Sequence, residues 1–263
     1  MKKIYLIGIG TGNPEHLTIQ AINALKMVNV FFILEKESEK NEDLVKLRKE
    51  ILQRYLPNEK YRVVVAKIPE RKKGGRELEV YKERVSSWRR QKAEIISNLI
   101  NNKMVDEETG AILIWGDPSL YDGHIEIMNY ILKRDMAKFQ YDVIPGITSM
   151  QVLTAKHKIP LNYIAESIQI TTGRRLKESQ PDDVKNVVVL LDNYLTYRDF
   201  SDTDLNIYWG AYLGTEKEIL VSGRLNEVIN EIIKTRNEAK KKYGWIMETY
   251  ILRSEDNEDP RKS

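Results

Sequence analysis

The sequence predicts an α/β fold made of two α/β domains. In the first half of the chain, short apolar runs rich in β-branched and aromatic residues alternate with stretches of helical periodicity, which is typical of a parallel sheet covered by helices. After Pro145-Gly146 a second series of strands and helices begins, and 263 residues suffice for two domains of ordinary size. We therefore expect domains over 1–145 and 146–253, and a disordered tail over 254–263, which lacks apolar residues.

The elements of the first domain follow from local patterns. The helix expected over Asn41–Tyr55 places Leu44, Leu47, Ile51 and Tyr55 on one stripe, at spacings of 3, 4 and 4. A longer helix is expected over Gly75–Asn101, and another follows the glycine-rich segment near the N-terminus. The expected strands are Lys3–Gly8, Val30–Leu34, Arg62–Ala66, Ala111–Trp115 and Tyr141–Ile144.

The second domain is expected to open with a helix from Ser149 to about His157 and to contain a second helix over Leu225–Thr235. Its expected strands are Ile168–Thr171, Val187–Leu191, Leu205–Trp209, Glu218–Val221 and Trp245–Leu252. No repeat of 20–50 residues is visible in the sequence, which excludes a solenoid.

Composition favours a cytoplasmic enzyme. The chain is 41% hydrophobic and 31% charged, and no apolar run approaches the roughly 18 residues that a membrane helix needs, so we expect no membrane span. There is no cysteine, which excludes disulfides and zinc-thiolate sites, and the three histidines are too scattered to suggest metal ligands. We therefore expect no metal.

The net charge of +3, from 42 basic and 39 acidic residues, is too balanced to indicate a nucleic-acid-binding protein, so we expect no nucleic-acid partner. Residues 67–92 nevertheless concentrate lysine and arginine around Tyr81 and Trp88. This pattern fits a solvated helix face, and it also fits a site for RNA or a small polyanion.

A glycine-rich segment, Gly8-Ile9-Gly10-Thr11-Gly12-Asn13-Pro14-Glu15-His16, follows the first strand and precedes a helix. Glycines there permit close approach of the backbone to a ligand. A dinucleotide-binding loop would require a further glycine at the helix start and an acidic ribose partner, and a Walker loop would require Gly-Lys-Ser/Thr. Neither is present, so this segment alone leaves open a tight turn or a ligand-binding loop.

Two further segments follow buried strands. Trp115-Gly116-Asp117-Pro118-Ser119-Leu120-Tyr121-Asp122 lies at the carboxyl end of a strand, where open α/β sheets bind ligands. Asp117 is suited to a cationic sulfonium or amino group, or to capping the following turn. Pro145-Gly146-Ile147-Thr148-Ser149 places hydroxyl groups at a helix start, where capping and ligand binding are compatible.

Together, and in this order, the three segments resemble the tetrapyrrole methylase family, whose members carry a Gly-x-Gly-x-Gly-x-Pro loop, a Gly-Asp-Pro turn and a Pro-Gly-Ile-Thr/Ser turn. The resemblance extends to about Leu252. It implies that S-adenosylmethionine binds in a folded conformation in a cleft between two α/β domains, and that the protein is a homodimer. Thr11 and Asn13 depart from the proline and aspartate that are frequent in the family. The implied donor contacts are Thr11, Trp115, Gly116, Asp117, Leu120, Thr148, Ser149, Leu191, Tyr212 and Leu213.

Within the family the match is narrowest to members of the cobalamin route that methylate precorrin-5 at C1 and release the C1 acetyl group as acetate. It rests on His16-Leu17-Thr18 with Gln20-Ala21, on the basic helix from Tyr81 to Trp88, on Trp115–Asp122, and on Ile170-Thr171-Thr172-Gly173-Arg174-Arg175-Leu176. Such a substrate carries many carboxylates, which arginine binds bidentately, and its deacetylation needs a general base beside a water. The candidates are Arg89, Arg90, Arg174 and Arg175 for the carboxylates, and His16, Asp117 and Tyr121 for acid/base chemistry.

Other functions stay open at this point. The same fold accommodates methylation of another tetrapyrrole position or of an RNA ribose. A non-catalytic nucleotide-binding module that uses the glycine-rich segment for an anion belongs to a different class. A nicotinamide-dependent dehydrogenase fits less well, because the loop lacks the required glycine and acidic partner.

Overall fold

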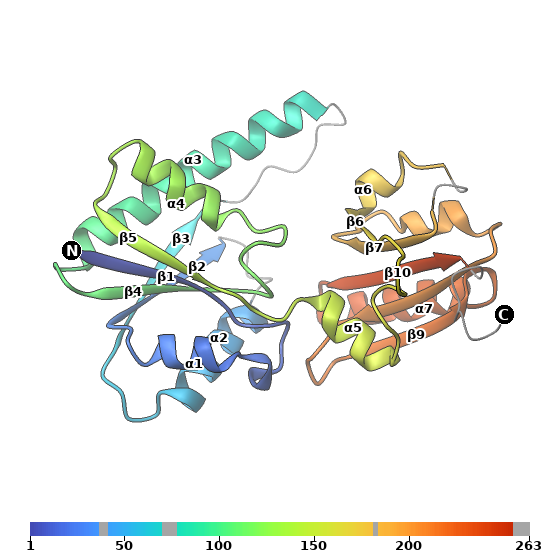
Figure 1. Ribbon diagram of the computed structural model, residues 1–263, viewed down its shortest axis with the longest axis horizontal. Coiled ribbons are helices and arrows are strands. Elements are labelled where there is room, and N and C mark those ends of the chain that lie inside the picture. The colour runs from blue at the N-terminus through green and yellow to red at the C-terminus, as the bar shows by residue number, and fades with distance from the viewer. Residues whose placement is uncertain (37–41, 70–77, 181–183, 255–263) are drawn as a thin grey trace. The chain divides into compact units, whose positions relative to one another are not determined.

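The computed structural model describes residues 1–36, 42–69, 78–180 and 184–254. The chain divides into two compact units, Met1–Ile147 and Thr148–Ser263, called unit 1 and unit 2 below. The boundary expected near residue 145 lies just before this division. Each unit holds a five-stranded sheet with helices packed on it (Figure 1), which confirms the predicted α/β class.

The sheet of unit 1 is parallel throughout, as predicted, with the strand order β3-β2-β4-β1-β5. All five predicted strands are present. Strand β4 ends at Ile114, so Trp115, which we had expected to be the last strand residue, lies in the loop that follows. The strands are β1 (Lys2–Gly8), β2 (Val30–Lys36), β3 (Arg62–Ile68), β4 (Thr109–Ile114) and β5 (Phe139–Ile144).

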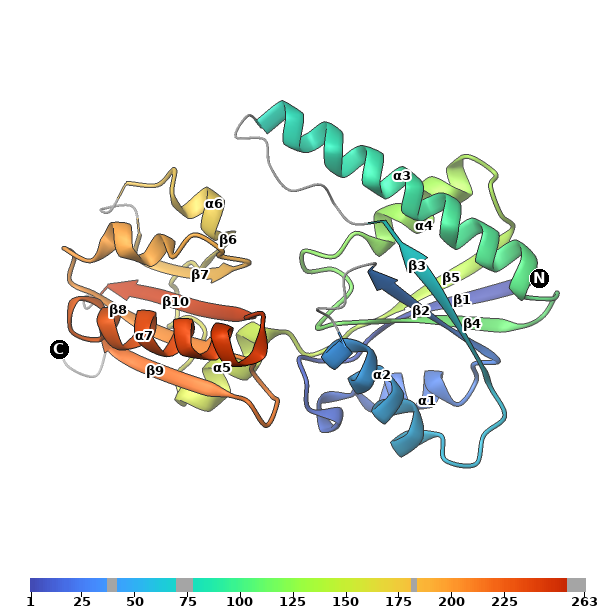
Figure 2. The same ribbon diagram turned by 180° about the vertical axis from the view of Figure 1, so that it is seen from behind.

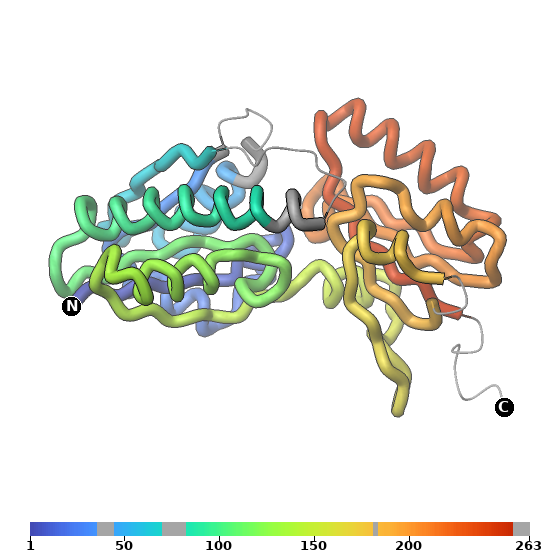
Figure 3. Tube along the Cα trace, turned by 90° about the horizontal axis from the view of Figure 1, so that it is seen from above, coloured from blue at the N-terminus to red at the C-terminus, as the bar shows by residue number. Residues whose placement is uncertain are grey.

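Helices cover both faces of this sheet. Helices α1 (Ile19–Leu25) and α2 (Glu42–Tyr55) lie on one face, and α3 (Leu78–Lys103) and α4 (His124–Lys133) lie side by side on the other (Figure 3). Alternating residues of β1 serve the two cores, because successive strand side chains point to opposite faces. The expected helices that begin at Asn41 and Gly75 are α2 and α3, and those two first residues lie outside the described ones. The described helices include none that is both long and apolar enough to cross a membrane.

Unit 2 has a mixed sheet with the order β6-β7-β10-β8-β9, in which only β6 and β7 are parallel neighbours. Helix α5 (Ser149–His157) packs against β8, β9 and β10. Helix α7 (Leu225–Tyr243) lies on the opposite face (Figure 2), where it shares one core with α6 (Gly173–Leu176) and η4 (Thr196–Phe200). The strands are β6 (Gln169–Thr172), β7 (Asn186–Leu190), β8 (Leu205–Ala211), β9 (Ile219–Arg224) and β10 (Glu248–Ser254).

The C-terminal elements differ from the prediction at their ends. Helix α7 continues to Tyr243 rather than ending at Thr235, because its buried stripe includes the charged residue Arg236, which an apolar pattern does not reveal. The last strand begins at Glu248 rather than Trp245, and it includes Ser254, which we had assigned to the tail. The remainder of the expected tail, 255–263, lies outside the described residues.

Candidate active site

Three chain segments meet at the carboxyl edge of the unit 1 sheet. Strand β1 lies between β4 and β5 and pairs with both, so the turns that follow the three strands become neighbours. The glycine-rich loop and the turn after β4 form a short antiparallel bridge, in which Gly116 N–H donates to Gly10 O at 2.8 Å. A Cβ built on Gly146 would lie 2.2 Å from the Gly116 carbonyl oxygen, and one on Gly8 would lie 2.6 Å from Gly146 N. Only glycine permits this crossing of backbones.

The Asp117 carboxylate stabilises this crossing through hydrogen bonds to two of the segments. One carboxylate oxygen accepts the backbone N–H of Gly146 at 2.8 Å, and the other accepts the N–H of Ser119 at 2.7 Å together with the Ser119 hydroxyl. The carboxylate therefore joins the turn after β4 to the turn after β5. The geometry favours the turn-capping interpretation of Asp117 and makes it a positioning residue.

The crossing leaves space and a polar group beside Gly116. A Cβ on Gly116, whose φ is +68°, would meet no atom within 4 Å. The Thr11 side chain is buried, and its hydroxyl oxygen has no hydrogen-bond partner in the described part of the chain. A buried hydroxyl without a partner is costly unless a ligand or water satisfies it. The residues present therefore fit a ligand that lies against the Gly116 backbone and hydrogen-bonds to Thr11.

His16 and Tyr121 lie on the segments that make this crossing. His16 ends the short helix η1 (Pro14–His16), and its side chain packs on Gly10, where an added Cβ would come within 2.6 Å of His16 Cβ. Tyr121 has a φ of +51° and is 49% exposed, and partial burial raises the pKa of its hydroxyl. Tyr121 therefore stays protonated at neutral pH, which suits a donor rather than a base.

A second polar cluster, which sequence analysis did not single out, lies just beyond the turn after β4. Asp122 and His124 form a side-chain pair, joined by a 2.6 Å contact between Oδ1 and Nδ1. Arg48 of α2 donates to the Leu113 carbonyl of β4 at 3.0 Å, and burial lowers its pKa to about 10. Lys92 of α3 is buried and stacks over the ring of Trp88 at 5.1 Å. The signal available in the sequence was only an Asp-x-His at the end of the turn, which is too short to be specific.

In unit 2 the residues expected at the donor occupy unusual backbone conformations. Leu191 directly follows β7 with a φ of 56°, and its side chain is 58% exposed. Tyr212 follows β8 with a φ of 50°, and its side chain is buried between Tyr243 and Trp245. Bulky residues seldom adopt positive φ, and such strain concentrates at functional sites. At Tyr212 the ring packs inward, so only its backbone and the start of Leu213, which is also buried, remain for a ligand.

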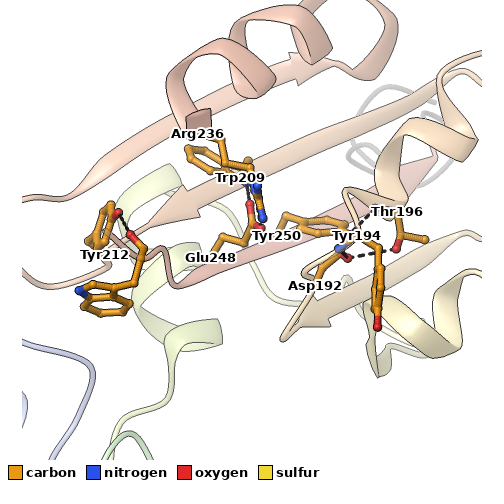
Figure 4. A network of polar contacts seen from close by, with 9 residues as sticks. Asp192, Tyr194, Thr196, Trp209, Tyr212, Arg236, Glu248 and Tyr250 are labelled. Atoms are coloured by element: carbon orange, nitrogen blue, oxygen red, sulfur yellow. Dashed lines mark hydrogen bonds and ion pairs between the residues drawn. The ribbon is translucent and has the colours of Figure 1, made fainter. Parts of the chain in front are cut away.

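Asp192 holds the loop that begins at Leu191. Its buried carboxylate accepts the backbone N–H groups of Tyr194 at 2.8 Å and Thr196 at 2.7 Å, and the hydroxyl of Tyr250 at 2.8 Å (Figure 4). A Cβ on Gly173 would lie 2.3 Å from its Oδ1. Apart from its position near the end of an apolar run, nothing in the local sequence distinguishes Asp192 as a functional residue.

Beside it in Figure 4, Glu248 links the sheet of unit 2 to α7. Its carboxylate accepts Trp209 Nε1–H at 2.9 Å and Arg236 Nε–H at 2.8 Å, and all three side chains are buried. Burial raises the pKa of Glu248 despite the opposing effect of Arg236. This network supports the end of β8, which leads into Tyr212.

The hydroxyl groups expected at the donor already have contacts within unit 2. The backbone N–H of Thr148 donates to the Gln151 side-chain oxygen at 2.9 Å, and the Thr148 hydroxyl contacts the same oxygen. Ser149 Oγ accepts the Thr249 hydroxyl at 2.9 Å and keeps its own proton for a further bond. Of the two, Ser149 is therefore the better placed to donate to a ligand.

The four candidate arginines differ in their surroundings. Arg89 pairs with Glu126 of α4, and Arg175 pairs with Glu178 at 2.7 Å. Arg90 is exposed, and Arg174 is partly buried at the start of α6. The structure thus brings Arg174 near Gly173 and the Asp192 loop, while Arg89 and Arg90 lie on α3.

The basic segment around α3 also has internal contacts. Trp88 donates its indole N–H to the Pro69 carbonyl at 2.8 Å, which occupies the ring's only polar group. Residues 70–77 and the Tyr81 side chain lie outside the described residues. The described part of the chain contains no group of three or more potential metal-binding side chains.

Comparison with known proteins agrees with this geometry. The model of the tetrapyrrole (corrin/porphyrin) methylases matches residues 3–229. The chain is 47% identical to a precorrin-6A synthase (deacetylating) from Sinorhizobium sp, over 96% of this chain and 95% of that protein.

Solved structures give the same result. A cobalamin synthesis related protein (CobF) from Corynebacterium diphtheriae is 36% identical and has a TM-score of 0.82, with 97% of this chain and 99% of that chain covered. Uroporphyrin-III C-methyl transferase from Thermus thermophilus, solved with S-adenyl homocysteine, shares the fold at 19% identity and a TM-score of 0.57, over 95% and 97% of the two chains. The chain therefore belongs to the tetrapyrrole (corrin/porphyrin) methylase family.

Proposed function

We propose that this protein is the S-adenosylmethionine-dependent C-methyltransferase that methylates precorrin-5 at C1 and releases acetate, giving precorrin-6A in cobalamin biosynthesis. The observation that carries the proposal is the 47% identity, over 96% of the chain, to a deacetylating precorrin-6A synthase. The 36% identity to the CobF structure over nearly the whole of both chains supports the same assignment.

The donor-binding part rests on the residues of each unit. In unit 1, the Thr11 hydroxyl and the open side of Gly116 are proposed to receive S-adenosylmethionine, with Trp115 and Leu120 flanking them and Asp117 holding the turn. In unit 2, the backbone at Leu191, Tyr212 and Leu213 and the Ser149 hydroxyl are proposed to contribute. When bound, the donor supplies an electrophilic methyl group on a sulfonium.

The substrate imposes two further demands. Its carboxylate arms require cations, and Arg174 is the best placed candidate because it lies partly buried beside the Asp192 loop. The reacting carbon must be held in line with the donor methyl, and such positioning contributes on the order of 7 kcal/mol or more to lowering the barrier. Loops fixed by internal carboxylates, such as those at Asp117 and Asp192, provide the rigidity that positioning needs.

We also propose that the protein acts in the cytoplasm as a homodimer. The first proposal rests on the composition of the chain, and the second rests on the resemblance to the family, in which homodimers are common. Analytical ultracentrifugation of the purified protein at micromolar concentration tests the second, since a single species of monomer mass would contradict it.

The direct test of the function is incubation with methyl-labelled S-adenosylmethionine and enzymatically generated precorrin-5. Label in the macrocycle and free acetate should appear in equal amounts. Label in the macrocycle without release of acetate would indicate that the enzyme methylates another tetrapyrrole position. If both signals are absent and the label is instead found in RNA, the ribose-methylating alternative is favoured. Donor binding without any methyl transfer would favour a non-catalytic binding module.

A further inference from the structure

A histidine–aspartate pair stands at the start of α4, directly beyond the turn that we assign to the donor. The Asp122 carboxylate oxygen Oδ1 lies 2.6 Å from His124 Nδ1 and also accepts the His124 backbone N–H at 2.8 Å. Because the ionised carboxylate only accepts, the Nδ1 atom carries the proton of this bond. Asp122 thus fixes both the orientation and the tautomer of the ring, and the lone pair is left on Nε2.

The other ring nitrogen of His124, Nε2, is buried. His124 is 8% exposed, and its Nε2 has no hydrogen-bond partner among the residues that the structure describes. A cap at a helix start explains the Asp122 bond to the backbone, but it does not explain an imidazole whose second nitrogen is desolvated without a partner. Such an atom fits a water or substrate group that it would contact during the reaction.

The charges around the ring keep it neutral. Burial lowers the pKa of His124, and the cations Lys92 of α3 and Arg48 of α2 lower it further, against the raising effect of Asp122. Burial opposes the charged form of Asp122, but the hydrogen bonds and charge of His124 outweigh this effect and lower its pKa. At neutral pH the pair therefore consists of a carboxylate and a neutral imidazole.

We propose that His124, oriented by Asp122, is the general base that activates water for removal of the acetyl group. The inference rests on the proposed function and adds a residue to it. His16, the candidate from the sequence, packs on Gly10, whereas the ring of His124 is oriented by its bond to Asp122. Catalysis by a histidine that a carboxylate orients in this way follows the same logic as in hydrolytic triads.

In the proposed step, water cleaves the bond between C1 and the acetyl group. A water oxygen adds to the acetyl carbonyl carbon while its proton passes to His124 Nε2. The bond between C1 and that carbonyl carbon then breaks, its electron pair remains on C1 of the macrocycle, and acetic acid leaves and ionises. The pair on C1 is the nucleophile that the methylation requires. Water, the acetylated macrocycle and the methyl donor thus give the methylated macrocycle, acetate, the demethylated donor and two protons.

The first test needs no substrate. The sequence has three histidines, so the imidazole ¹⁵N signals are assigned with single substitutions. We expect His124 to show a protonated Nδ1 and an unprotonated Nε2 at neutral pH, with Asp122→Asn altering the Nδ1 signal. A His124 ring that is protonated on Nε2 at neutral pH would overturn the proposal, since it then has no lone pair to act as a base.

The second test separates catalysis from structure. His124→Asn keeps an amide N–H near the Nδ1 position for Asp122 and removes Nε2, whereas His157→Gln in α5 is the control for loss of a partly buried histidine outside the proposed site. His124→Asn should bind S-adenosylhomocysteine like the wild type and slow acetate release about 10²- to 10⁴-fold. In ¹⁸O-labelled water, wild-type acetate should contain one solvent oxygen.

The pH profile distinguishes a base from a helix cap. The acidic limb of kcat/KM should disappear in His124→Asn, and Asp122→Asn should shift it to lower pH because the carboxylate raises the pKa of His124. Acetate release at the wild-type rate by His124→Asn, or an acidic limb that is lost in His16→Ala instead, would overturn the inference. If the wild type itself neither transfers label nor releases acetate, the proposed function fails rather than this inference.

Discussion

Replacing Gly116 by alanine separates backbone strain from loss of donor binding. The φ of Gly116 is +68°, and the added methyl would point into space where no atom lies within 4 Å. A non-glycine residue in the left-handed region costs roughly 1–2 kcal/mol. We therefore expect Gly116→Ala to fold, with its free energy of unfolding lowered by about that amount and no further loss from steric overlap.

Donor affinity should fall much more than this modest strain suggests. If the donor occupies the space beside Gly116, the methyl must overlap it, and overpacking of this kind costs about 1–3 kcal/mol. That range raises Kd about fivefold to more than a hundredfold. Urea unfolding gives the stability of the variant, and isothermal titration calorimetry with S-adenosylhomocysteine gives its affinity.

Gly244 provides a matched control. Its φ is +77°, an added Cβ would likewise meet nothing within 4 Å, and it ends α7 as the left-handed cap. Gly244→Ala should therefore lose about the same stability, roughly 1–2 kcal/mol, while donor affinity stays at the wild-type value. Wild-type affinity in Gly116→Ala, or an equal loss in both variants, would refute the assignment of the donor to the open side of Gly116.

Three further predictions concern the surroundings of the site. Gly146→Ala should prevent folding of unit 1 or lower its thermal midpoint sharply, because its Cβ would lie 2.2 Å from a backbone oxygen; an unchanged midpoint in a thermal melt would contradict the observed crossing. Arg236→Met should lower the free energy of unfolding by about 3–5 kcal/mol at neutral pH by leaving Glu248 as an uncompensated buried charge. Because burial raises the pKa of Glu248, the contribution of Glu248 to folding stability is most favourable below its unfolded-state pKa and is lost as the pH rises through its folded-state pKa. Urea titrations should therefore show that the stability difference between wild type and Arg236→Met shrinks towards acidic pH. A difference that is constant with pH would argue against an ionised Glu248. The double variant Arg174→Ala, Arg175→Ala should raise the KM for precorrin-5 and leave donor affinity unchanged, with the larger share from Arg174 because it is partly buried whereas Arg175 is exposed. Equal loss of both affinities would point to misfolding.

Most helices and strands could be predicted from the spacing of apolar residues in the sequence, and the elements that were missed have physical causes. The inner strands β1 and β4 are largely buried, and the strands of the parallel sheet read as apolar or β-branched runs, so they were found along the whole of unit 1. In unit 2 the last turns of α7 and the end of β10 were missed, because their buried positions hold Arg236, which pairs with Glu248, and Arg253, which donates to the distant Pro160 carbonyl. A pattern of apolar residues cannot anticipate a charge that a contact far along the chain makes tolerable.

The site was predictable only to the extent that backbone chemistry determines it. Glycines that permit crossing or positive φ are visible as glycines, so Gly116 and Gly146 were identified from short motifs. Leu191 and Tyr212 adopt positive φ without being glycine, and only the family resemblance pointed to them. Asp122 and His124 were missed because their significance lies in a bond between two side chains, which spacing alone does not specify.

The acidic residues near the ends of the strands divide by what their carboxylates accept. Asp117 and Asp192 accept backbone N–H and hydroxyl groups from segments near and far along the chain, and these bonds occupy the carboxylate oxygens in fixing loops. The Asp122 carboxylate accepts a backbone N–H as well, but it also holds an imidazole whose other nitrogen is buried and unpartnered among the described residues. A carboxylate that accepts backbone N–H and hydroxyl groups positions a site, whereas one that orients an imidazole acts through that ring. Substitution of Asp117 or Asp192 should therefore change affinity and stability together, and substitution of Asp122 should change the pH dependence of the reaction.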